Sequence, residues 1–414
     1  MKILLQTGLS GIILLLLLGS TFGLPAVAAA DDPPPMHLDW RDIDGENFLT
    51  PVKDQAVCLA GSTFAYVGMV EAMMKIALDN PFVEPNLSEQ QLYSCAGGVC
   101  LDPPPIDDVV ALLMAEGLVD EACLPYENHE NASCEMLCAD NAQRTVRPTG
   151  LVSLDYPSPL GMTYALLEGP LIARALLHLD FLDYEGGIYQ HGNSPLLGMQ
   201  DLLIVGYDAE QQYWIVKGSY GADWGENGYA RVSWLEPIFG AGIARVALDV
   251  EAMCAANQAP QIDSLYVEAD AATQDLFFSF GFADTEANLA GGELWYRIDE
   301  EPAQRFAEPL RRLQGTDSTS EAIFGYHLSL TEPLGAHTLT ISVRDLCGAA
   351  SNELSGEFNV TATEPPVDDD DDAVDDDIDD DDSEAGEPNL ADDDENDTVM
   401  ADDEESGDDG GCGF

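Results

Sequence analysis

PVKDQAVCLAGSTFAYVGMVEA, residues 51–72, is the stretch of this 414-residue chain that decides its fold. Gln55 and Cys58 belong to a short Gln-x-x-Cys turn, and the residues after it show an apolar spacing of three or four positions. The apolar positions are Phe64, Val67, Val70, Met74 and Ala77. This spacing predicts a helix with one buried face over residues 61–78, which begins directly after a loop.

The stretch resembles the nucleophile segment of the papain family of cysteine peptidases, which typically reads P-V-K-D-Q-G-x-C-G-S-C-W-A-F-S. The matching positions are Pro51, Val52, Lys53, Asp54, Gln55, Cys58 and Phe64. The second Cys of that motif, which supplies the family's catalytic thiol at a helix N-terminus, falls on Gly61. Because glycine has no side chain, the resemblance implies that the nucleophile is lost.

Further motifs extend the resemblance over residues 37–254. They are Leu38-Asp39-Trp40-Arg41, the Leu-Ser-Glu-Gln-Gln-Leu run at 87–92, Leu124-Pro125-Tyr126, the Val-Gly-Tyr at 205–207 and the Trp-Gly-Glu-Asn-Gly-Tyr at 224–229. In the second motif, Ser88 should cap a helix while Gln91 reaches back as a capping box. The first half is helix-like at 61–78 and 106–116, and the second half alternates short apolar runs with glycine turns, as strands do. An α+β papain-like domain is therefore expected, with a helical lobe, a β-rich lobe and a cleft between them.

Peptide hydrolysis in such a cleft requires a thiolate, an imidazole and a group that orients the imidazole. By register, the family's His falls on Gln200 and its Asn falls on Gly218. Together with Gly61, all three catalytic positions are replaced. Gln55 is retained, and the resemblance makes its amide the family's oxyanion donor.

Three other cleft positions also depart from the family. Ser62 occupies the position of the Trp that follows the family's nucleophile, and Tyr220 occupies the position of the Trp that shields its His–Asn pair. Pro103 occupies the position of a family glycine whose backbone pairs with the extended substrate. Proline has no N–H to donate, so one rung of that pairing cannot form. These changes argue against a retained family-type peptide cleft.

No other residue is expected to replace the lost thiol. Cys58 matches a structural half-cystine of the family and Cys100 stands at its partner's position, so the resemblance implies a disulfide. Ser62 lies one residue along the helix from the nucleophile position and would still need a base. The histidines supply no base in register; they are His37, His129, His178, His191, His327 and His337.

The other cysteines of the first domain also fit a disulfide scaffold. Cys95 should pair with either Cys134 or Cys138, and Cys123 with the other. None of the cysteines shows C-x-x-C spacing, so a zinc site is not expected. No cofactor is expected either.

The N-terminus has the features of a secretory signal. Met1-Lys2 precedes an apolar run at 12–18, and small residues at 26–30 fit a cleavage site. The run is shorter than the roughly 20 residues of a membrane span, although an uncleaved anchor is the alternative. Residues 1–30 are therefore assigned to the signal and 31–254 to the papain-like domain, and the product is predicted to be secreted or at the cell surface.

The chain is strongly acidic, with 77 Asp and Glu against 15 Lys and Arg. Binding to phosphate backbones needs a basic surface, so nucleic acid is excluded as a partner. Residues 364–414 hold 26 of the acidic residues and no Lys or Arg, which predicts a disordered tail over 361–414. Without an ordered Asp-rich calcium loop, the tail should collect divalent cations only loosely. Cys412 is read as a free or intermolecular thiol.

Residues 257–360 show short alternating segments separated by turns. The segments are 262–267, 276–280, 293–298, 325–330, 337–343 and 357–360. This spacing predicts a small all-β sandwich, which loosely resembles immunoglobulin-like modules of secreted enzymes. Cys254 and Cys347 lie at its two ends, and both are counted among the disulfide cysteines. Its role is left open among spacer, ligand-binding domain and adhesion unit.

Two classes of function follow from these observations. The first is a secreted, non-catalytic papain-family homologue that acts as a binding or structural module, with a peptide or a cell-surface protein as partner. The second is an enzyme, either an active cysteine-type peptidase or another hydrolase with a relocated catalytic group. The sequence leaves the oligomeric state open.

Overall fold

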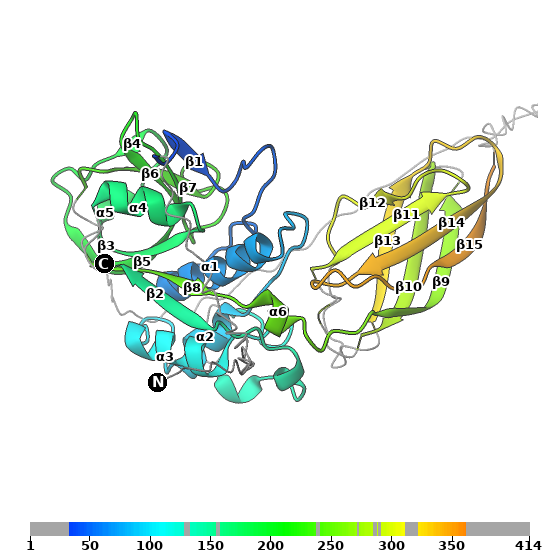
Figure 1. The fold of residues 1–414 in the computed structure, drawn as a ribbon, viewed down its shortest axis with the longest axis horizontal. Coiled ribbons are helices and arrows are strands. Elements are labelled where there is room, and N and C mark those ends of the chain that lie inside the picture. Colours follow the sequence, from blue (N-terminus) through cyan, green and yellow to red (C-terminus); the bar gives the residue numbers. More distant parts are fainter. Residues whose placement is uncertain are drawn as a thin grey trace, which may run out of the picture. The chain divides into compact units, whose positions relative to one another are not determined.

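The computed structural model describes residues 33–127, 133–154, 158–236, 241–270, 273–284, 288, 291–310 and 322–361 (Figure 1). The predicted signal segment, His129, Cys412 and all but the first residue of the predicted tail lie outside these ranges. Within them, no helix is both long enough and apolar enough to cross a membrane. The same ranges contain no group of three or more side chains that could hold a metal ion.

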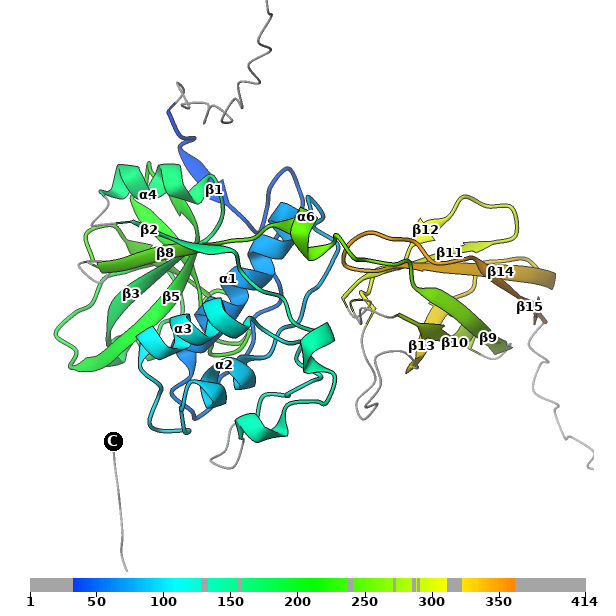
Figure 2. The same cartoon turned by 60° about the horizontal axis from the view of Figure 1, so that its bottom comes forward.

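The central helix of the first lobe is α1, Gly61–Ala77, as its apolar spacing predicts. Fourteen of its residues are buried, so the helix is enclosed on nearly all sides. The prediction of a single buried face therefore underestimates how much of its surface is covered. Ala77, predicted to be buried, is exposed because the helix ends there. Helices α2, Glu89–Cys95, and α3, Ile106–Glu116, complete this lobe (Figure 2).

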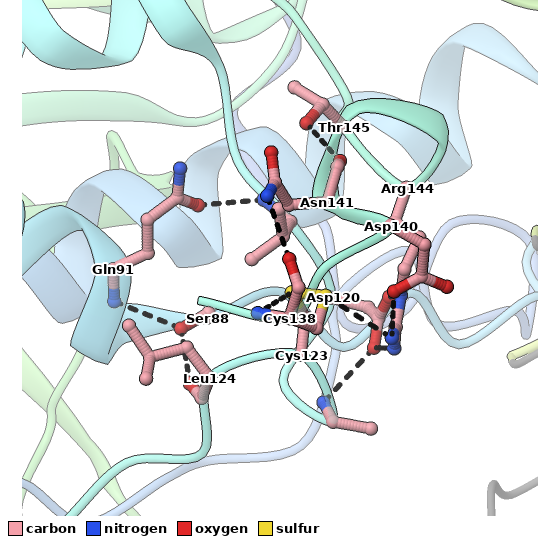
Figure 3. Close-up of a disulfide and its surroundings, with 12 residues drawn as sticks. Ser88, Gln91, Asp120, Cys123, Leu124, Cys138, Asp140, Asn141, Arg144 and Thr145 are labelled. Carbon is pink, nitrogen blue, oxygen red and sulfur yellow. Dashed lines mark hydrogen bonds and ion pairs between the residues drawn. A yellow bond between two sulfur atoms is a disulfide. The ribbon is translucent and has the colours of Figure 1, made fainter. Parts of the chain in front are cut away.

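Only half of the predicted capping box forms at α2. The Ser88 Oγ accepts a hydrogen bond from the Gln91 backbone N–H at 2.9 Å (Figure 3). The Gln91 side chain does not reach back. Its Oε1 accepts from the Val119 N–H at 2.7 Å, and its Nε2 donates to the Gly117 carbonyl at 3.4 Å. The glutamine therefore ties α2 to the segment that follows α3.

The second lobe is built on an eight-stranded sheet with strand order β2-β8-β3-β5-β6-β7-β4, and β1 also pairs with β5. The strands are β1 His37–Asp39, β2 Gly150–Leu154, β3 Leu171–His178, β4 Ile188–Tyr189, β5 Leu196–Asp208, β6 Tyr213–Lys217, β7 Tyr229–Ser233 and β8 Ala241–Ala247. The short helices are α4 Pro159–Leu166, α5 Leu179–Leu182 and α6 Val250–Met253, with 3₁₀ turns at Cys134–Met136 and Asn141–Gln143. One hydrophobic core joins the sheet to α1, and a second joins it to α4 and α5. The first core brings the N-terminus of α1 against β5, which positions the candidate site.

Residues 261–360 form two antiparallel sheets around one core. The three-stranded sheet has the order β13-β10-β9, and the four-stranded sheet has the order β12-β11-β14-β15. The strands are β9 Gln261–Asp270, β10 Asp275–Ala283, β11 Glu293–Ile298, β12 Gln304–Arg305, β13 Ala322–Ser329, β14 Gly335–Arg344 and β15 Leu354–Val360. Alternating residues such as Leu276, Phe278 and Phe280 are buried in the shared core. The immunoglobulin-like assignment and the domain boundaries remain predictions.

Four disulfides join the eight cysteines of the described residues. Cys58 is bridged to Cys100, as the resemblance implies. The open choice resolves as Cys95–Cys134 and Cys123–Cys138, the second of which is drawn in Figure 3. Cys254, directly after α6, is bridged to Cys347 between β14 and β15. The last bridge encloses all strands from β9 to β14 in one covalent loop.

Candidate functional site

The structure brings Gly61 and Gln200 into direct contact, although 139 residues separate them in the sequence. A Cβ atom built on Gly61 would lie 2.2 Å from the Gln200 Nε2 and 2.3 Å from its Cδ. The Gln200 amide therefore fills the space that a side chain at position 61 would need. Where the resemblance places a thiol and an imidazole, this chain has an amide packed on a glycine.

Tyr220 fixes the orientation of that amide. Its hydroxyl donates to the Gln200 Oε1 at 3.2 Å, which leaves the Nε2 on the side of Gly61. Burial raises the pKa of Tyr220 to about 12, so the hydroxyl stays protonated at physiological pH. The Tyr220 ring packs on Trp224 with ring centroids 5.0 Å apart. Tyr220 thus holds Gln200 in place, whereas the resemblance gives its position a shielding role.

Gly218 is enclosed by Trp224 and the Gly228 backbone. A Cβ on Gly218 would lie 2.8 Å from the Trp224 Cζ3 and 3.1 Å from the Gly228 carbonyl oxygen. The Gly218 backbone N–H donates to that same carbonyl at 2.9 Å. A larger residue at this position would have to displace the indole, so the pocket for an orienting side chain is closed.

Ser62 connects the two lobes. Its Oγ accepts from the Asp201 backbone N–H at 2.9 Å, and this bond joins the first turn of α1 to β5. The Asp201 carboxylate, 2% exposed, is bound by the Arg174 guanidinium at 3.0 and 3.2 Å. The serine oxygen therefore acts as a structural acceptor in a contact between the lobes.

Gln55 is buried behind the disulfide loop. Its Nε2 donates to the Cys58 carbonyl at 2.9 Å, and its Oε1 accepts from the Ser219 hydroxyl at 2.6 Å. One of its two amide N–H groups is therefore used within its own turn. Pro103 lies exposed on the loop after Cys100, directly following a bridge between Val99 and Asp102.

Two of the histidines considered from the sequence form a stacked pair and bond to groups other than Gln200. The rings of His178 and His191 are 4.2 Å apart and inclined by 11°. The His178 Nδ1 bonds the Ser194 carbonyl at 2.8 Å, and the His191 Nδ1 bonds the Glu236 carboxylate. These contacts tie the end of β3 to the segment between β4 and β5, and that segment to Glu236 after β7.

Sequence reasoning missed a buried cluster of charges behind Gly61. Lys53 pairs with Glu71 at 3.0 Å and with Glu89 at 2.7 Å. Glu71 also accepts from the Leu87 N–H at 2.8 Å and from the Thr50 hydroxyl. Lys217 donates to the Thr50 carbonyl at 2.8 Å. One sequence signal was available, because Glu71 interrupts an otherwise apolar segment of α1.

A cavity of about 20 Å³ separates this cluster from Gln200. It is lined by Gly61, Gln200, Lys53, Glu89 and Lys217, among others, and is large enough for one water molecule. Because Oε2 of Glu89 is buried without a hydrogen-bond partner among the described residues, the cavity offers a polar place for that water.

Burial shifts the pKa values of the cluster. It raises the pKa of Glu89 to about 7 and lowers the pKa of Lys217 to about 8. It also raises to about 8 the pKa of Glu121, a carboxyl that interacts electrostatically with Glu89 and whose Oε1 accepts from the Tyr126 backbone N–H at 2.6 Å. Burial also opposes the charge of Lys53, but the carboxylates of Glu71 and Glu89 outweigh it and raise the pKa of this lysine. The cluster is therefore expected to take up protons near neutral pH.

The raised pKa values predict that stability falls as pH rises from about 5 to about 7.5. The folded pKa of each of the two carboxyls exceeds its unfolded value, so their stabilising contribution is lost as pH rises through the folded pKa. Lys217, whose folded pKa is depressed, has the opposite dependence, but it stays charged until pH approaches about 8. Urea unfolding across this window should show the fall, and Glu121→Gln should reduce it. An unchanged slope in that variant would contradict the assignment.

Comparisons with known proteins place residues 34–243 in register with the family described as papain family cysteine protease. Cathepsin B-like CP2 of Giardia intestinalis is 30% identical over 213 residues, covering 49% of this chain and 69% of the relative. Mouse pro-cathepsin H is 31% identical over 208 residues, covering 48% and 60%. Among solved structures, digestive procathepsin L2 of Tenebrio molitor matches with a TM-score of 0.46 and 28% identity, covering 53% of this chain and 70% of that one.

Proposed function

Because the chain belongs to the papain family of cysteine proteases, we propose that it is a non-hydrolysing member that acts by binding, with a peptide or a cell-surface protein as its partner. The observation that carries the proposal is the contact between Gly61 and Gln200. A nucleophile, a base and an orienting group must meet for peptide hydrolysis, and these positions hold a glycine, an amide and a second glycine.

The surroundings support the same proposal. Cys58, the nearest sulfur to Gly61 in the sequence, is held in a disulfide and cannot form a thiolate while bridged. Ser62 offers its oxygen to the Asp201 N–H. Among the described histidines, His178 and His191 are engaged with Ser194 and Glu236. The remaining alternative is a hydrolase that recruits one of these groups on binding substrate.

Four disulfides also support export of the protein, because such bridges persist in oxidising compartments. We therefore propose a secreted or cell-surface location. Detection of the chain in the cytosolic fraction with its cysteines reduced would count against it.

The test of function is a broad peptide-library assay on the full chain. The parent is expected to show turnover at background level, alongside an active papain-family peptidase as positive control. Turnover that a thiol-alkylating reagent blocks, or labelling of Ser62 by a serine-hydrolase probe, would establish the enzymatic alternative.

A matched variant distinguishes a disarmed cleft from a rebuilt one. Gly61→Cys, Gln200→His and Gly218→Asn together should create a thiol that small alkylating reagents modify, with peptide turnover still very low. The reason is the closed space at Gly218, where a Cβ meets Trp224 at 2.8 Å. A displacement of reacting groups by about 1 Å can cost ~100-fold in rate. Efficient turnover by this variant would show that the peptide cleft is intact.

A further inference from the structure

Three ring side chains cross the outer face of the three-stranded sheet. Tyr266 of β9 and Phe277 of β10 have ring centroids 6.3 Å apart, and Phe277 lies 5.1 Å from His327 of β13. Phe277 and His327 are also direct cross-strand partners. We call these three residues the aromatic strip. It lies opposite the core, because the adjacent residues Leu276 and Phe278 are buried.

Part of the strip has a structural explanation. A Cβ on Gly325 of β13 would lie 3.1 Å from the Phe277 ring, so this glycine lets the ring lie against the neighbouring strand. Such aromatic–glycine pairs stabilise sheets. This does not account for Tyr266, which is 53% exposed and whose hydroxyl donates to the Glu268 carboxylate at 2.7 Å. Tyr266 presents a ring to solvent with a carboxylate held beside it.

The charge of this face is one-sided. Strands β9, β10 and β13 contain four acidic residues and no Lys or Arg; the acidic residues are Asp263, Glu268, Asp270 and Asp275. The other sheet contains Arg297, Arg305 and Arg344. Aromatic faces attract cations through their quadrupoles, and carboxylates nearby strengthen that attraction. The face is therefore complementary to a positively charged partner.

We propose that the aromatic strip and Glu268 bind a basic peptide segment, with an Arg or Lys side chain seated on the Tyr266 and Phe277 rings. The ring planes favour this partner over a polysaccharide, because neighbouring rings are inclined by 59° and 53°. A run of sugar rings needs a flat platform, whereas inclined rings partly surround a single side chain. The site is independent of the position of Gly61 and of the proposed function there.

The probe is a fluorescein-labelled peptide of alternating Gly and Arg, titrated with the full chain at low salt and followed by fluorescence anisotropy. Tyr266→Ala should weaken binding about 3–5-fold, and Glu268→Gln about 2–4-fold, with the effect shrinking as salt is raised. The acidic residues of 364–414 also attract the probe. They are the same in every variant and add the same binding to each, so the difference in binding between variants reports on the strip.

Two controls match the substitutions. Tyr164→Ala removes a tyrosine that is 39% exposed on α4, and Glu300→Gln removes an exposed carboxylate after β11; neither should change affinity. Phe277→Leu keeps apolar cover on Gly325 and should still weaken binding if the ring itself is used. Equal affinity of Tyr266→Ala and Tyr164→Ala would overturn the proposal. So would saturable binding of a neutral polysaccharide, such as hydroxyethylcellulose, that Tyr266→Ala abolishes and the peptide does not compete.

Discussion

Replacing Glu71 by Ala is expected to lower the free energy of unfolding by about 3–5 kcal/mol. Glu71 is 1% exposed and accepts from Lys53, the Thr50 hydroxyl and the Leu87 N–H. Its removal leaves Lys53 with one fewer carboxylate in a site where burial already opposes the charge. The Thr50 hydroxyl and the Leu87 N–H lose their buried acceptor, and Lys53 keeps only Glu89 as a carboxylate partner. Breaking up a buried network in this way costs more than the lost attraction alone, which makes this one of the two largest effects we expect.

Urea unfolding of the full chain measures the loss, and Glu116→Ala provides the control. Glu116 ends α3 with an exposed side chain, so its removal should change the free energy of unfolding by less than about 0.5 kcal/mol. The loss of unfolding free energy in Glu71→Gln should lie between those of Glu71→Ala and Glu116→Ala, because glutamine keeps the shape of the side chain and loses its charge. A loss below about 1 kcal/mol for Glu71→Ala would mean that water reaches the cluster.

Removing the Cys254–Cys347 bridge with Cys254→Ser and Cys347→Ser is expected to destabilise the two-sheet region by about 4 kcal/mol. The bridge spans 93 residues, and closing so long a loop restricts the unfolded chain strongly. Hydrogen exchange of peptides from β10 and β14, followed by mass spectrometry, reports on this region separately from the first domain.

Cys412→Ser is the matched control for loss of a cysteine outside the four bridges, and its exchange rates should equal those of the parent. If β10 and β14 exchange at the parental rate in the double variant, the bridge contributes little to holding this region folded. Faster exchange confined to β15 would limit the loss of stability to the last strand of this region, and would equally contradict the prediction.

The sequence predicts individual elements well where local signals agree. Helix α3 has the predicted bounds because Pro105 and Gly117 stop it on both sides. The predicted capping role of the Gln91 side chain is not observed, because this side chain accepts instead from the Val119 N–H, a partner 28 residues away. Capping patterns read locally cannot anticipate such a distant donor.

The candidate site shows the same division. Register along the chain identifies Gly61, Gln200 and Gly218 one at a time, but their mutual packing depends on how β5 meets α1. The buried cluster is harder still, because Lys53 and Lys217 are surface residues by type. Only the fold shows that they face the same carboxylates.

The indole of Trp224 gives the site an optical consequence. Its ring centroid lies 5.0 Å from that of Tyr220 and 5.2 Å from that of Phe181, and the Tyr220 hydroxyl in turn holds the Gln200 amide. A ligand that displaces this amide breaks its hydrogen bond with the Tyr220 hydroxyl, and we expect the change to reach the indole through the ring contact between Tyr220 and Trp224. Occupancy of the space between Gly61 and Gln200 is therefore expected to change the tryptophan emission and near-ultraviolet dichroism of the unlabelled protein, to which Trp224 is one of five contributing indoles.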